Sequence, residues 1–384
     1  MTGVSLEDAV RIVTTTNPTF AVGEADIRGV TYPVFKNIPA HTRGLLQAAC
    51  DVQPADETYL VYRDQRWSYD DFTHEINRMA HVLCDRFGVV KGQPVALAMQ
   101  NCPEMLTLMM AITSVGGVVV FLNAWWTSEE LDYAVRDSGA KLIFADRTRA
   151  ARLAPLETAL ELQVVGVRDA ETPVTYQKVL SPSVDVSWPG QAIETDDDMA
   201  IMYSSGTTGH PKGVVQTHRG AMNAVYTWLM QVDLAAVMDP PEAHAPPPPR
   251  PAFLVITPLF HVTATHPVFL LSLPAGAKLV LMDKWDVEEA VTLIEREQIT
   301  RILGVPTQSA DLFETAQRMG KSLDSLEFLG SGGAKRPAAQ VGALAQAFPK
   351  AMIATGWGMT ETNANGIGMA GPASVAQPGV AGRL

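Results

Sequence analysis

A short stretch near the middle of the chain combines hydroxyl side chains, glycines and one lysine. From 204 to 213 it reads Ser-Ser-Gly-Thr-Thr-Gly-His-Pro-Lys-Gly, between the apolar segments 199–203 and 213–216. Glycines let the backbone turn tightly, so that successive N–H groups can point into one concavity. The residues suited to anionic oxygens are Ser204, Ser205, Gly206, Thr207, Thr208, Gly209 and Lys212. Hydroxyl donors and a point charge predict a phosphate-binding loop; a flexible linker is the alternative, which the apolar flanks disfavour.

Two common nucleotide-binding patterns do not fit this sequence. A Walker A loop places its lysine directly after a glycine and opens a helix, whereas Pro211 precedes Lys212 here and a strand-like segment follows. The G-x-G-x-x-G dinucleotide pattern fails in segment 330–335, because Lys335 occupies the final glycine position. A different kind of phosphate loop is required.

The loop closely resembles the signature Y-T-S-G-T-T-G-x-P-K-G of the adenylate-forming (AMP-binding) superfamily. The match runs without interruption from Tyr203 to Gly213, with Ser204 as the one difference. This superfamily includes acyl-CoA synthetases, firefly luciferase and the adenylation domains of nonribosomal peptide synthetases. Two later segments, 330–334 and 356–361, are similar to further motifs of the family and occur in the family's order.

The resemblance gives roles to these later segments. According to the resemblance, residues with little or no side chain bring their backbone close to the nucleotide and acyl pockets. They are Gly332, Gly333, Ala334, Gly356 and Gly358. Trp357 would pack on adenine; it can stack but lacks the hydroxyl of the more common tyrosine. Thr360 would contact the α-phosphate, and Glu361 would hold Mg²⁺, a cation that prefers oxygen ligands. Taken alone, segment 330–334 could instead be a turn required by packing, and segment 356–361 could be a surface turn.

The pair Phe260-His261 resembles the aromatic-His segment that precedes the acyl pocket in this family. Amino-acid-activating members usually carry Phe-Asp there, and the Asp pairs with the ammonium group of the substrate. His261 replaces that acid, which favours a carboxylic acid without an α-amino group; a purely structural histidine is the alternative. The predicted catalytic residues are Lys212, His261, Thr360 and Glu361.

The resemblance implies an AMP-forming acyl-CoA synthetase that uses ATP, Mg²⁺ and coenzyme A. A substrate carboxylate would attack the α-phosphorus of ATP, and the thiol of coenzyme A would then attack the acyl-adenylate and release AMP. An amino-acid- or aryl-acid-activating adenylation domain and a catalytically silent nucleotide-binding relative stay open, as does the acyl chain. Because residues 378–384 end where the family pattern continues, we expect an N-terminal domain fragment deficient in full turnover.

Composition narrows the choice of partners and location. A net charge of −12 over 384 residues argues against nonspecific binding to nucleic acids and to anionic membranes. The three cysteines cannot all pair and lack metal-ligand spacing, which predicts a cytoplasmic location.

The uncharged stretch 105–126 is long enough to span a membrane, but Gly116 and Gly117 interrupt it. We expect a buried helix, a turn and a buried strand there. The sequence leaves open whether the protein forms a homo-oligomer.

The segments predicted to bind the nucleotide and the acid lie among alternating helix and strand patterns. Ser68 with Asp71 and Thr127 with Glu130 form capping-box patterns that start helices, and a further helix is expected over 266–273, with its proline in the first turn. The alternation predicts an α/β fold whose parallel strands carry the functional segments at their carboxyl ends. The resemblance implies two stacked mostly parallel sheets, layered α-β-α-β-α, and the start of a small β-barrel at the C-terminal end.

The predicted division of the chain follows its composition. A stretch rich in Ser, Pro and Asp at 181–198 marks a boundary, and the prolines of 239–251 predict a surface excursion. The predicted parts are an α/β subdomain at 1–190 that starts with an extended arm at 1–40, a second α/β subdomain at 191–374 with the phosphate loop, and the truncated start of a following segment at 375–384. The family's mobile C-terminal domain is expected to be absent.

Overall fold

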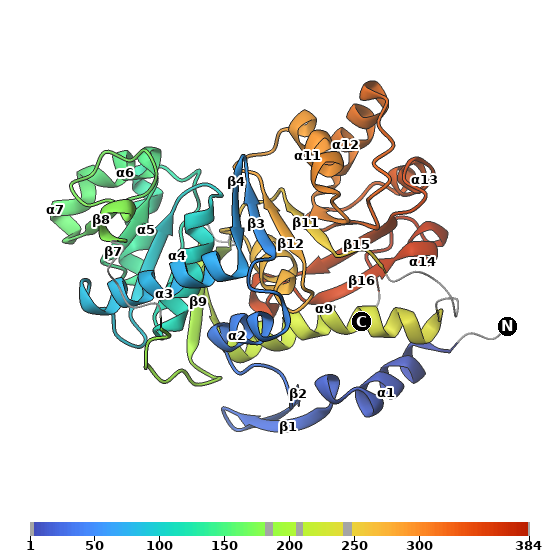
Figure 1. The fold of residues 1–384 in the computed structure, drawn as a ribbon, viewed down its shortest axis with the longest axis horizontal. Coiled ribbons are helices and arrows are strands. Elements are labelled where there is room, and N and C mark those ends of the chain that lie inside the picture. Colours follow the sequence, from blue (N-terminus) through green and yellow to red (C-terminus); the bar gives the residue numbers. More distant parts are fainter. Residues whose placement is uncertain (1–3, 181–186, 205–209, 241–247, 383–384) are drawn as a thin grey trace.

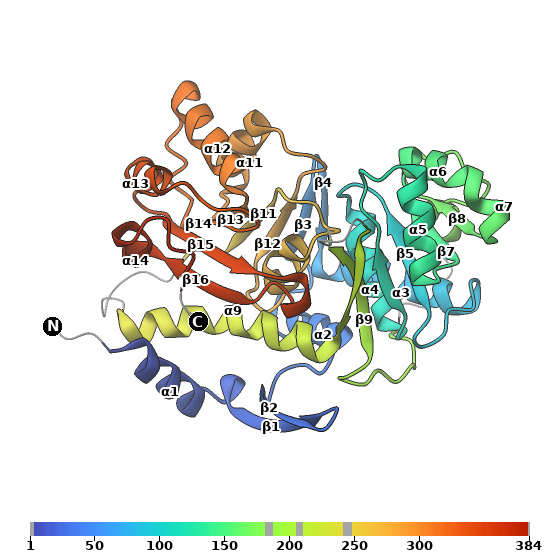
Figure 2. The same cartoon turned by 180° about the vertical axis from the view of Figure 1, so that it is seen from behind.

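The computed structural model describes residues 4–180, 187–204, 210–240 and 248–382. Two large sheets lie next to each other, with helices between them and on their outer sides (Figure 1). The view from behind shows the same arrangement (Figure 2). A separate two-stranded hairpin near the N-terminus pairs β1 (Val22–Ile27) with β2 (Val30–Phe35). The predicted α/β fold with two mostly parallel sheets is confirmed.

The six-stranded sheet has the order β10-β9-β6-β5-β7-β8 and is parallel except for the β9–β10 pair. Its strands are β5 (Pro94–Ala98), β6 (Val118–Phe121), β7 (Leu142–Ala145), β8 (Gln163–Gly166), β9 (Asp198–Ser204) and β10 (Lys212–Thr217). The eight-stranded sheet has the order β16-β15-β14-β13-β11-β12-β3-β4 and is antiparallel only at its two edge pairs. Its strands are β3 (Thr58–Tyr62), β4 (Gln65–Ser68), β11 (Ala252–Val255), β12 (Lys278–Leu281), β13 (Arg301–Gly304), β14 (Phe328–Ser331), β15 (Met352–Gly358) and β16 (Gly366–Ala370).

Alternating side chains of the central strands explain the layers. In β5, Val95 and Leu97 belong to the large core between the sheets, whereas Ala96 and Ala98 face the outer core. The helices that contribute to the central core include α2 (Thr42–Val52), α3 (Tyr69–Asp85), α4 (Pro103–Ser114), α8 (Tyr176–Val179) and α9 (His218–Met238). The six-stranded sheet is covered by α5 (Ser128–Ser138), α6 (Arg147–Leu153) and α7 (Glu157–Leu160), and the eight-stranded sheet by α11 (Val287–Glu297), α12 (Pro306–Met319) and α13 (Ala338–Ala347). Strands buried on both faces are typical of parallel sheets covered by helices.

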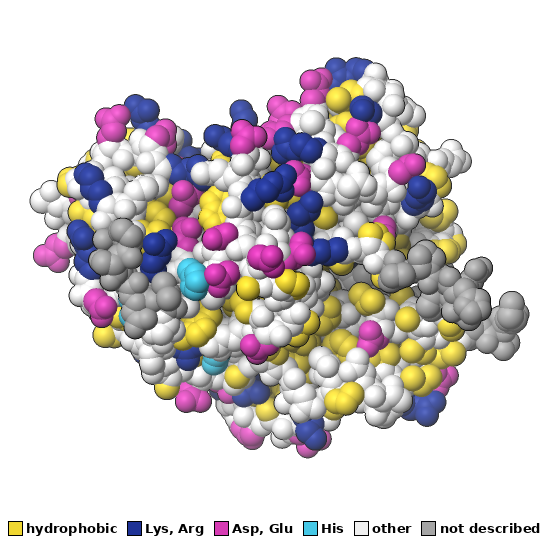
Figure 3. Space-filling view, in the orientation of Figure 1, with side chains coloured by type: hydrophobic (Ala, Val, Ile, Leu, Met, Phe, Trp, Pro, Cys, Tyr) yellow, Lys and Arg dark blue, Asp and Glu magenta, His cyan; other side chains and the backbone are white. Residues whose placement is uncertain are grey.

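The N-terminal arm is folded, so the prediction of an extended arm is wrong. Helix α1 (Leu6–Thr16) begins at Ser5, whose side chain accepts a hydrogen bond from the N–H of Asp8, and it packs along α9. Ala9 and Val13 are the buried residues of this helix. Leu6, Ala9, Val10 and Val13 stand at helical spacing after Ser5, so the sequence does carry a helix pattern, and the interpretation as an extended arm overlooked it. Figure 3 shows hydrophobic side chains exposed over α1 and α9.

The two sheets exchange strands across the predicted boundary at residue 190. Strands β3 and β4 join the eight-stranded sheet, while β9 and β10 join the six-stranded sheet. At the C-terminal end, β16 pairs with β15 and α14 (Gly371–Ala376) follows. The described residues up to 382 therefore do not contain the predicted start of a β-barrel. Segments 181–186 and 241–247, which hold much of the predicted boundary and of the proline-rich excursion, lie outside the described residues.

Local predictions in the central core are confirmed with one exception. The capping boxes at Ser68 and Thr127 start α3 and α5. The uncharged stretch forms α4, a turn and β6, and no described helix is long and apolar enough to cross a membrane. The helix predicted over 266–273 starts earlier, as α10 (Val262–Ala264), and continues as the π-helix η3 (Thr265–Leu270). Pro267 thus lies inside a helical segment, where its missing N–H favours a wider turn.

Candidate active site

The β9–β10 hairpin carries the predicted phosphate loop. Ser204 ends β9 and Lys212 begins β10, and these two residues are direct partners across the antiparallel pair. Lys212 is exposed and Ser204 is partly exposed. The loop residues between them, Ser205, Gly206, Thr207, Thr208 and Gly209, lie outside the described residues. Lys212 therefore presents a hydrated point charge at the base of the loop.

Helix α5 holds both ends of this loop. The hydroxyl of Tyr203 donates to the carboxylate of Asp137 at 2.8 Å, and burial together with that carboxylate raises the pKa of Tyr203. Trp126, just before α5, packs edge-on against the ring of Tyr203 with 5.4 Å between centroids. On the far side of the loop, the ring of His210 stacks on Tyr133 at 4.9 Å. The loop is thus attached at both ends to the outer layer of the six-stranded sheet.

The acidic motif reaches this hairpin from the eight-stranded sheet. Strand β15 continues to Gly358, and a 3₁₀ turn, η4 (Thr360–Thr362), follows it with Glu361 exposed. The buried side chain of Gln216 in β10 donates from Nε2 to the carbonyl oxygen of Thr360 at 2.8 Å. Because Gln216 and Lys212 share a strand, this hydrogen bond holds the Glu361 turn beside the strand that begins at Lys212. The strand that follows the phosphate loop is therefore in contact with the turn that carries Glu361.

The glycine-rich segment and the aromatic residue lie at the ends of neighbouring strands. Residues 332–334 directly follow β14 and are partly or fully exposed. A Cβ on Gly332 would lie 3.5 Å from the carbonyl oxygen of Gly356, so the segment runs beside the strand that carries Trp357. Trp357 is 52% exposed. Gly358 has to be glycine, because a Cβ there would collide with a backbone oxygen of the turn that returns to β16.

Arg336 is a residue of this region that sequence reasoning missed. Its side chain is 1% exposed. Nε donates to the hydroxyl of Ser331 at 2.8 Å, and Nη2 donates to the carbonyl oxygen of Ala354 at 3.3 Å. Burial lowers the pKa of this guanidinium to about 10. The two hydrogen bonds tie β14 to β15 just below the segments 332–334 and 356–358. Adjacent lysine and arginine suggest a solvated pair, so the sequence offered no signal for this burial.

His261 lies at the carboxyl end of β11 in an aromatic cluster. Its ring centroid is 4.7 Å from that of Phe260 and 6.4 Å from that of exposed Trp125, which follows β6 of the other sheet. Desolvation by this packing lowers the pKa of His261, although the residue as a whole is exposed. Asn101 holds the segment, because its Oδ1 accepts a 2.7 Å hydrogen bond from the N–H of Leu259. Sequence reasoning missed Trp125 and Asn101, since both reach this segment across the contact between the sheets.

The predicted site residues thus fall into three places at the strand ends. Ser204 and Lys212 are adjacent, and Thr360 and Glu361 are held beside their strand. Segments 332–334 and 356–358 lie side by side. Among the described residues, no hydrogen bond joins His261 to either group.

Glu361 could take part in a metal site only together with a ligand. Among the described residues, no group of three or more His, Cys, Asp or Glu side chains is arranged to hold a metal ion. Glu361 is a single exposed carboxylate. This fits Mg²⁺ bound with a nucleotide, because Mg²⁺ usually takes one or two carboxylates together with phosphate oxygens and water.

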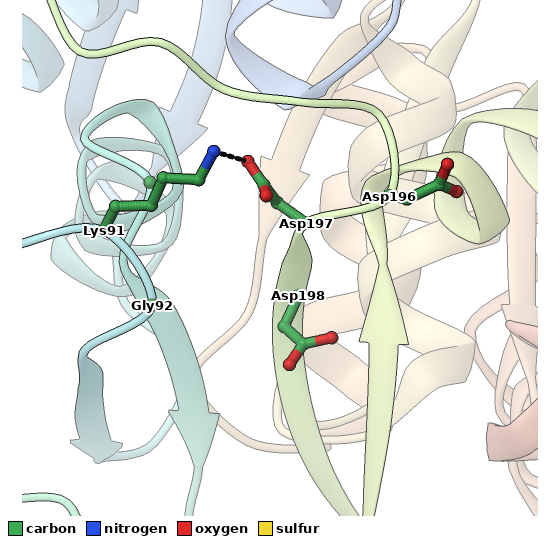
Figure 4. Close-up of a pocket in the computed structure, with 6 residues that line it drawn as sticks. Lys91, Gly92, Asp196, Asp197 and Asp198 are labelled. Carbon is green, nitrogen blue, oxygen red and sulfur yellow. Dashed lines mark ion pairs between the residues drawn. The ribbon is translucent and has the colours of Figure 1, made fainter. Parts of the chain in front are cut away.

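A hollow at the opposite end of β9 is separate from this site. Figure 4 shows the residues that line it, and Lys91, Gly92, Asp196, Asp197 and Asp198 are labelled there. Lys91 pairs with Asp197 at 2.7 Å, and Arg219 pairs with Asp196 at 2.6 Å. These charges are largely compensated within the chain, and Ser204 lies at the other end of the strand.

Comparison with known proteins gives one consistent result. The sequence matches the AMP-binding enzyme family over residues 46–384. 4-Coumarate–CoA ligase 3 of Arabidopsis thaliana is 31% identical over 291 residues, which cover 73% of this chain and 50% of that protein. 2-Succinylbenzoate–CoA ligase of Bacillus pumilus is 29% identical over 334 residues, which cover 84% of this chain and 60% of that protein. The chain spans about half the length of the curated relatives it matches.

Solved structures agree with the fold. The N-terminal domain of FACL13 from Mycobacterium tuberculosis, solved with an inhibitor, superposes with a TM-score of 0.75 at 26% identity and covers 89% of this chain and 82% of that one. The anthranilate CoA ligase AuaEII in complex with anthranoyl-AMP superposes with a TM-score of 0.78 at 21% identity, covering 89% of this chain and 64% of that one. The second likeness shows the fold alone.

Proposed function

The chain belongs to the AMP-binding enzyme family, and from this premise we propose that it binds ATP and activates a carboxylic acid as an acyl-adenylate for transfer to coenzyme A. The observation that carries the proposal is the hydrogen bond from Gln216 to Thr360. It holds β10 beside the turn of Glu361, and the other end of this strand, at Lys212, is the base of the glycine- and hydroxyl-rich loop. A triphosphate with its Mg²⁺ is a ligand that uses the lysine, the carboxylate and the loop together.

The proposed chemistry starts with attack of the substrate carboxylate on the α-phosphorus of ATP. The bond from that phosphorus to its bridging oxygen breaks, and pyrophosphate leaves. Lys212 stabilises the negative charge on the phosphate oxygens, and the donors of segment 205–209 are its proposed partners. Thr360 contacts the α-phosphate. Mg²⁺ at Glu361 would supply further neutralisation of the phosphate charge.

The adenine is proposed to lie between residues 332–334 and Trp357. Bare backbone in the first segment permits close approach of a flat base, and the exposed indole face permits stacking. Arg336 supports this pocket from below without touching the base, because its hydrogen bonds tie the two strands together.

The acid is proposed to lack an α-amino group. The segment at His261 is lined by Phe260 and Trp125, which offer aromatic surface and no carboxylate to pair with an ammonium. Aromatic acids and fatty acids are the two classes to test, and coenzyme A is the proposed thiol. The three cysteines are all free, which supports a proposed cytoplasmic location.

Binding of N-acylsulfamoyl adenosines, unreactive mimics of acyl-adenylates, tests this proposal without any need for turnover. The mimic with the correct acyl group should bind at least about a hundredfold more tightly than AMP, because it occupies the nucleotide and acyl pockets together. Aryl, fatty and short acyl groups identify the acid, and an aminoacyl series tests an amino-acid-activating domain. If no mimic binds more tightly than AMP, the proposed function is wrong and a silent nucleotide-binding relative is the better description.

A further inference from the structure

The turn that carries Glu361 has an unfavourable backbone. Asn363 and Ala364, directly after η4, have φ angles of 54° and 67°. Side chains other than glycine rarely adopt this left-handed region, and alanine has no polar group to compensate for it. The turn is closed by hydrogen bonds from the N–H of Ala364 to Met359 at 2.9 Å and from the N–H of Asn365 to Thr362 at 3.0 Å. Such a conformation persists only where the surroundings fix it.

The amide of Asn363 packs against the first turn of α9. A Cβ on Gly220 would lie 2.6 Å from Nδ2 of Asn363, which is closer than a Cβ can approach another atom. Gly220 is fixed in turn, since its N–H donates to the hydroxyl of Thr217 at 3.2 Å. The absence of a side chain at position 220 therefore leaves the space that the Asn363 amide occupies beside the helix that follows β10.

A buried histidine meets the same amide from the π-helix. His266 is completely buried, and its Nδ1 is 2.9 Å from the hydroxyl of Thr265. Burial lowers the pKa of His266 to about 3, while the side chain of Asn363 acts in the opposite sense, as a hydrogen-bonding neighbour does. Among the described residues, Nε2 of His266 and Oδ1 of Asn363 are both buried without a hydrogen-bond partner. Two unpaired polar atoms on neighbouring buried side chains are available to each other, because neither is accessible to water.

We infer that Gly220, His266 and Asn363 form a turn clamp, a set of positioning residues that fixes Glu361 relative to Lys212. Gly220 admits the amide, His266 backs it from the π-helix, and Asn363 holds the left-handed turn. Gln216 fixes the same turn through Thr360. Both anchoring points follow Lys212 in the chain: Gln216 lies near the other end of β10, and Gly220 lies in the first turn of α9. The clamp therefore acts through β10, because it fixes where the turn of Glu361 lies relative to the strand that begins at Lys212. This role rests on the proposed function of Glu361 and Lys212.

Alanine at position 220 distinguishes an effect on the position of the Glu361 turn from an effect on the stability of the fold. Gly220→Ala places a methyl group against Asn363, yet alanine favours a helix more than glycine does. Gly342→Ala is the matched control, because Gly342 lies in α13 and a Cβ there meets nothing within 4 Å. Hydrogen exchange of the peptide over 359–365 should become about tenfold faster in Gly220→Ala and stay unchanged in the control. Unchanged exchange in Gly220→Ala would overturn the clamp.

Two further variants isolate the polar contact. Asn363→Gly keeps the left-handed turn accessible but removes the amide, and His266→Leu removes the imidazole. Both should accelerate exchange of 359–365, and His266→Gln, which restores a polar atom, should rescue part of the protection. Exchange in α11, which lies away from the turn, reports any general loss of stability. Equal acceleration in both places would mean that these residues are merely structural.

The functional consequence is measured as nucleotide binding to the 384-residue chain. The ratio of ATP affinity with Mg²⁺ to that with chelator should fall by about tenfold in Gly220→Ala and Asn363→Gly, because a displaced Glu361 loses its contact with the cation. A ratio equal to that of the wild type, despite faster exchange, would overturn the link to Glu361. If Glu361→Gln also leaves the ratio unchanged, the proposed role of Glu361 itself fails, while hydrogen exchange still decides whether the clamp exists.

Discussion

The exposed rim of the site and the buried layer behind it use polar residues in different ways. In the rim, Lys212 and Glu361 are exposed and Trp357 is 52% exposed. In the buried layer, Arg336 is 1% and Asn101 is 5% exposed, and their hydrogen bonds fix backbone segments. Rim charges remain hydrated and available to a ligand, whereas buried groups depend on their partners in the chain. Substitutions should therefore separate chemistry from stability.

The largest expected effect comes from the rim. Lys212→Ala should slow acyl-adenylate formation by about 2–4 kcal/mol, the usual cost of losing one charge-stabilising donor. Pyrophosphate release measures it. The melting temperature should hardly change, because the side chain is exposed. Transfer from preformed acyl-adenylate to coenzyme A should also be spared, since the leaving phosphates are gone; equal losses in both steps would contradict this role.

The buried layer should show the opposite behaviour. Asn101 donates to the carbonyl oxygens of Thr257 and Met282 at 2.9 and 3.1 Å and accepts from Leu259. Asn101→Ala leaves these buried groups unpaired and should lower the free energy of unfolding by about 2–3 kcal/mol. Asn37→Ala is the control, because Asn37 makes one exposed hydrogen bond and should cost less than about 0.5 kcal/mol. Similar losses in the two variants would remove the distinction between layers.

The Mg²⁺ dependence of ATP binding tests a second residue of the exposed rim. Glu361→Gln keeps the shape of the side chain and removes the charge that a hard cation needs. The Mg²⁺ concentration for half-maximal ATP binding should rise about tenfold, or about 1.4 kcal/mol. A metal titration that is the same in both proteins would show that Glu361 is not a ligand.

The buried layer also predicts a pH dependence of stability. Burial lowers the pKa of both His218 and His266 from 6.5 to about 3, so both are neutral in the folded chain and gain protons on unfolding below pH 6.5. Their contribution is complete above pH 6.5 and decreases as the pH falls toward 3, by roughly 1 kcal/mol per pH unit for each. Denaturant titrations between pH 4.5 and 6.5 measure how the free energy of unfolding changes with pH. This window lies above the pH range in which Glu297 contributes a slope, because the pKa of Glu297 is lowered from 4.5 to about 2. His218→Gln should reduce the slope by the His218 contribution, roughly 1 kcal/mol per pH unit; an unchanged slope would contradict the assignment.

The smallest expected effect is at the exposed indole. Trp357→Ala should weaken ATP binding by roughly 1 kcal/mol, at the low end for base stacking because the ring is half exposed. Trp357→Tyr keeps a stacking face and should bind ATP almost as tightly as the wild type. Calorimetry of the two variants decides whether the ring acts by stacking, and a larger loss in Trp357→Tyr would exclude that role.

Local patterns allowed much of the fold to be predicted. The capping boxes at Ser68 and Thr127 and the interrupted apolar stretch that became α4 and β6 depend on neighbours in sequence, and all three are confirmed. Helix α1 was missed although Leu6, Ala9, Val10 and Val13 stand at helical spacing after the N-cap Ser5. The π-helix at Pro267 was missed because a proline predicts a helix start, whereas here the tertiary packing of η3 accommodates it.

The site was predictable at its rim and not in its buried layer. Lys212 and Glu361 stand in motifs whose residue types and spacing are enough to suggest chemistry. Arg336 and His266 act through burial, which arises only when strands and helices distant in sequence pack together. A left-handed Asn363 has no sequence signature either, because asparagine is compatible with many turns.

The most direct test of the central claim is a double-mutant cycle on MgATP binding. If Lys212 and Glu361 act on one ligand from two sheets, Lys212→Ala and Glu361→Gln should be non-additive, with an interaction energy of about 1 kcal/mol or more in MgATP affinity. The same pair should be additive in the free energy of unfolding, because both residues are exposed. Additive losses in MgATP binding would contradict the claim that the two motifs meet on a single triphosphate.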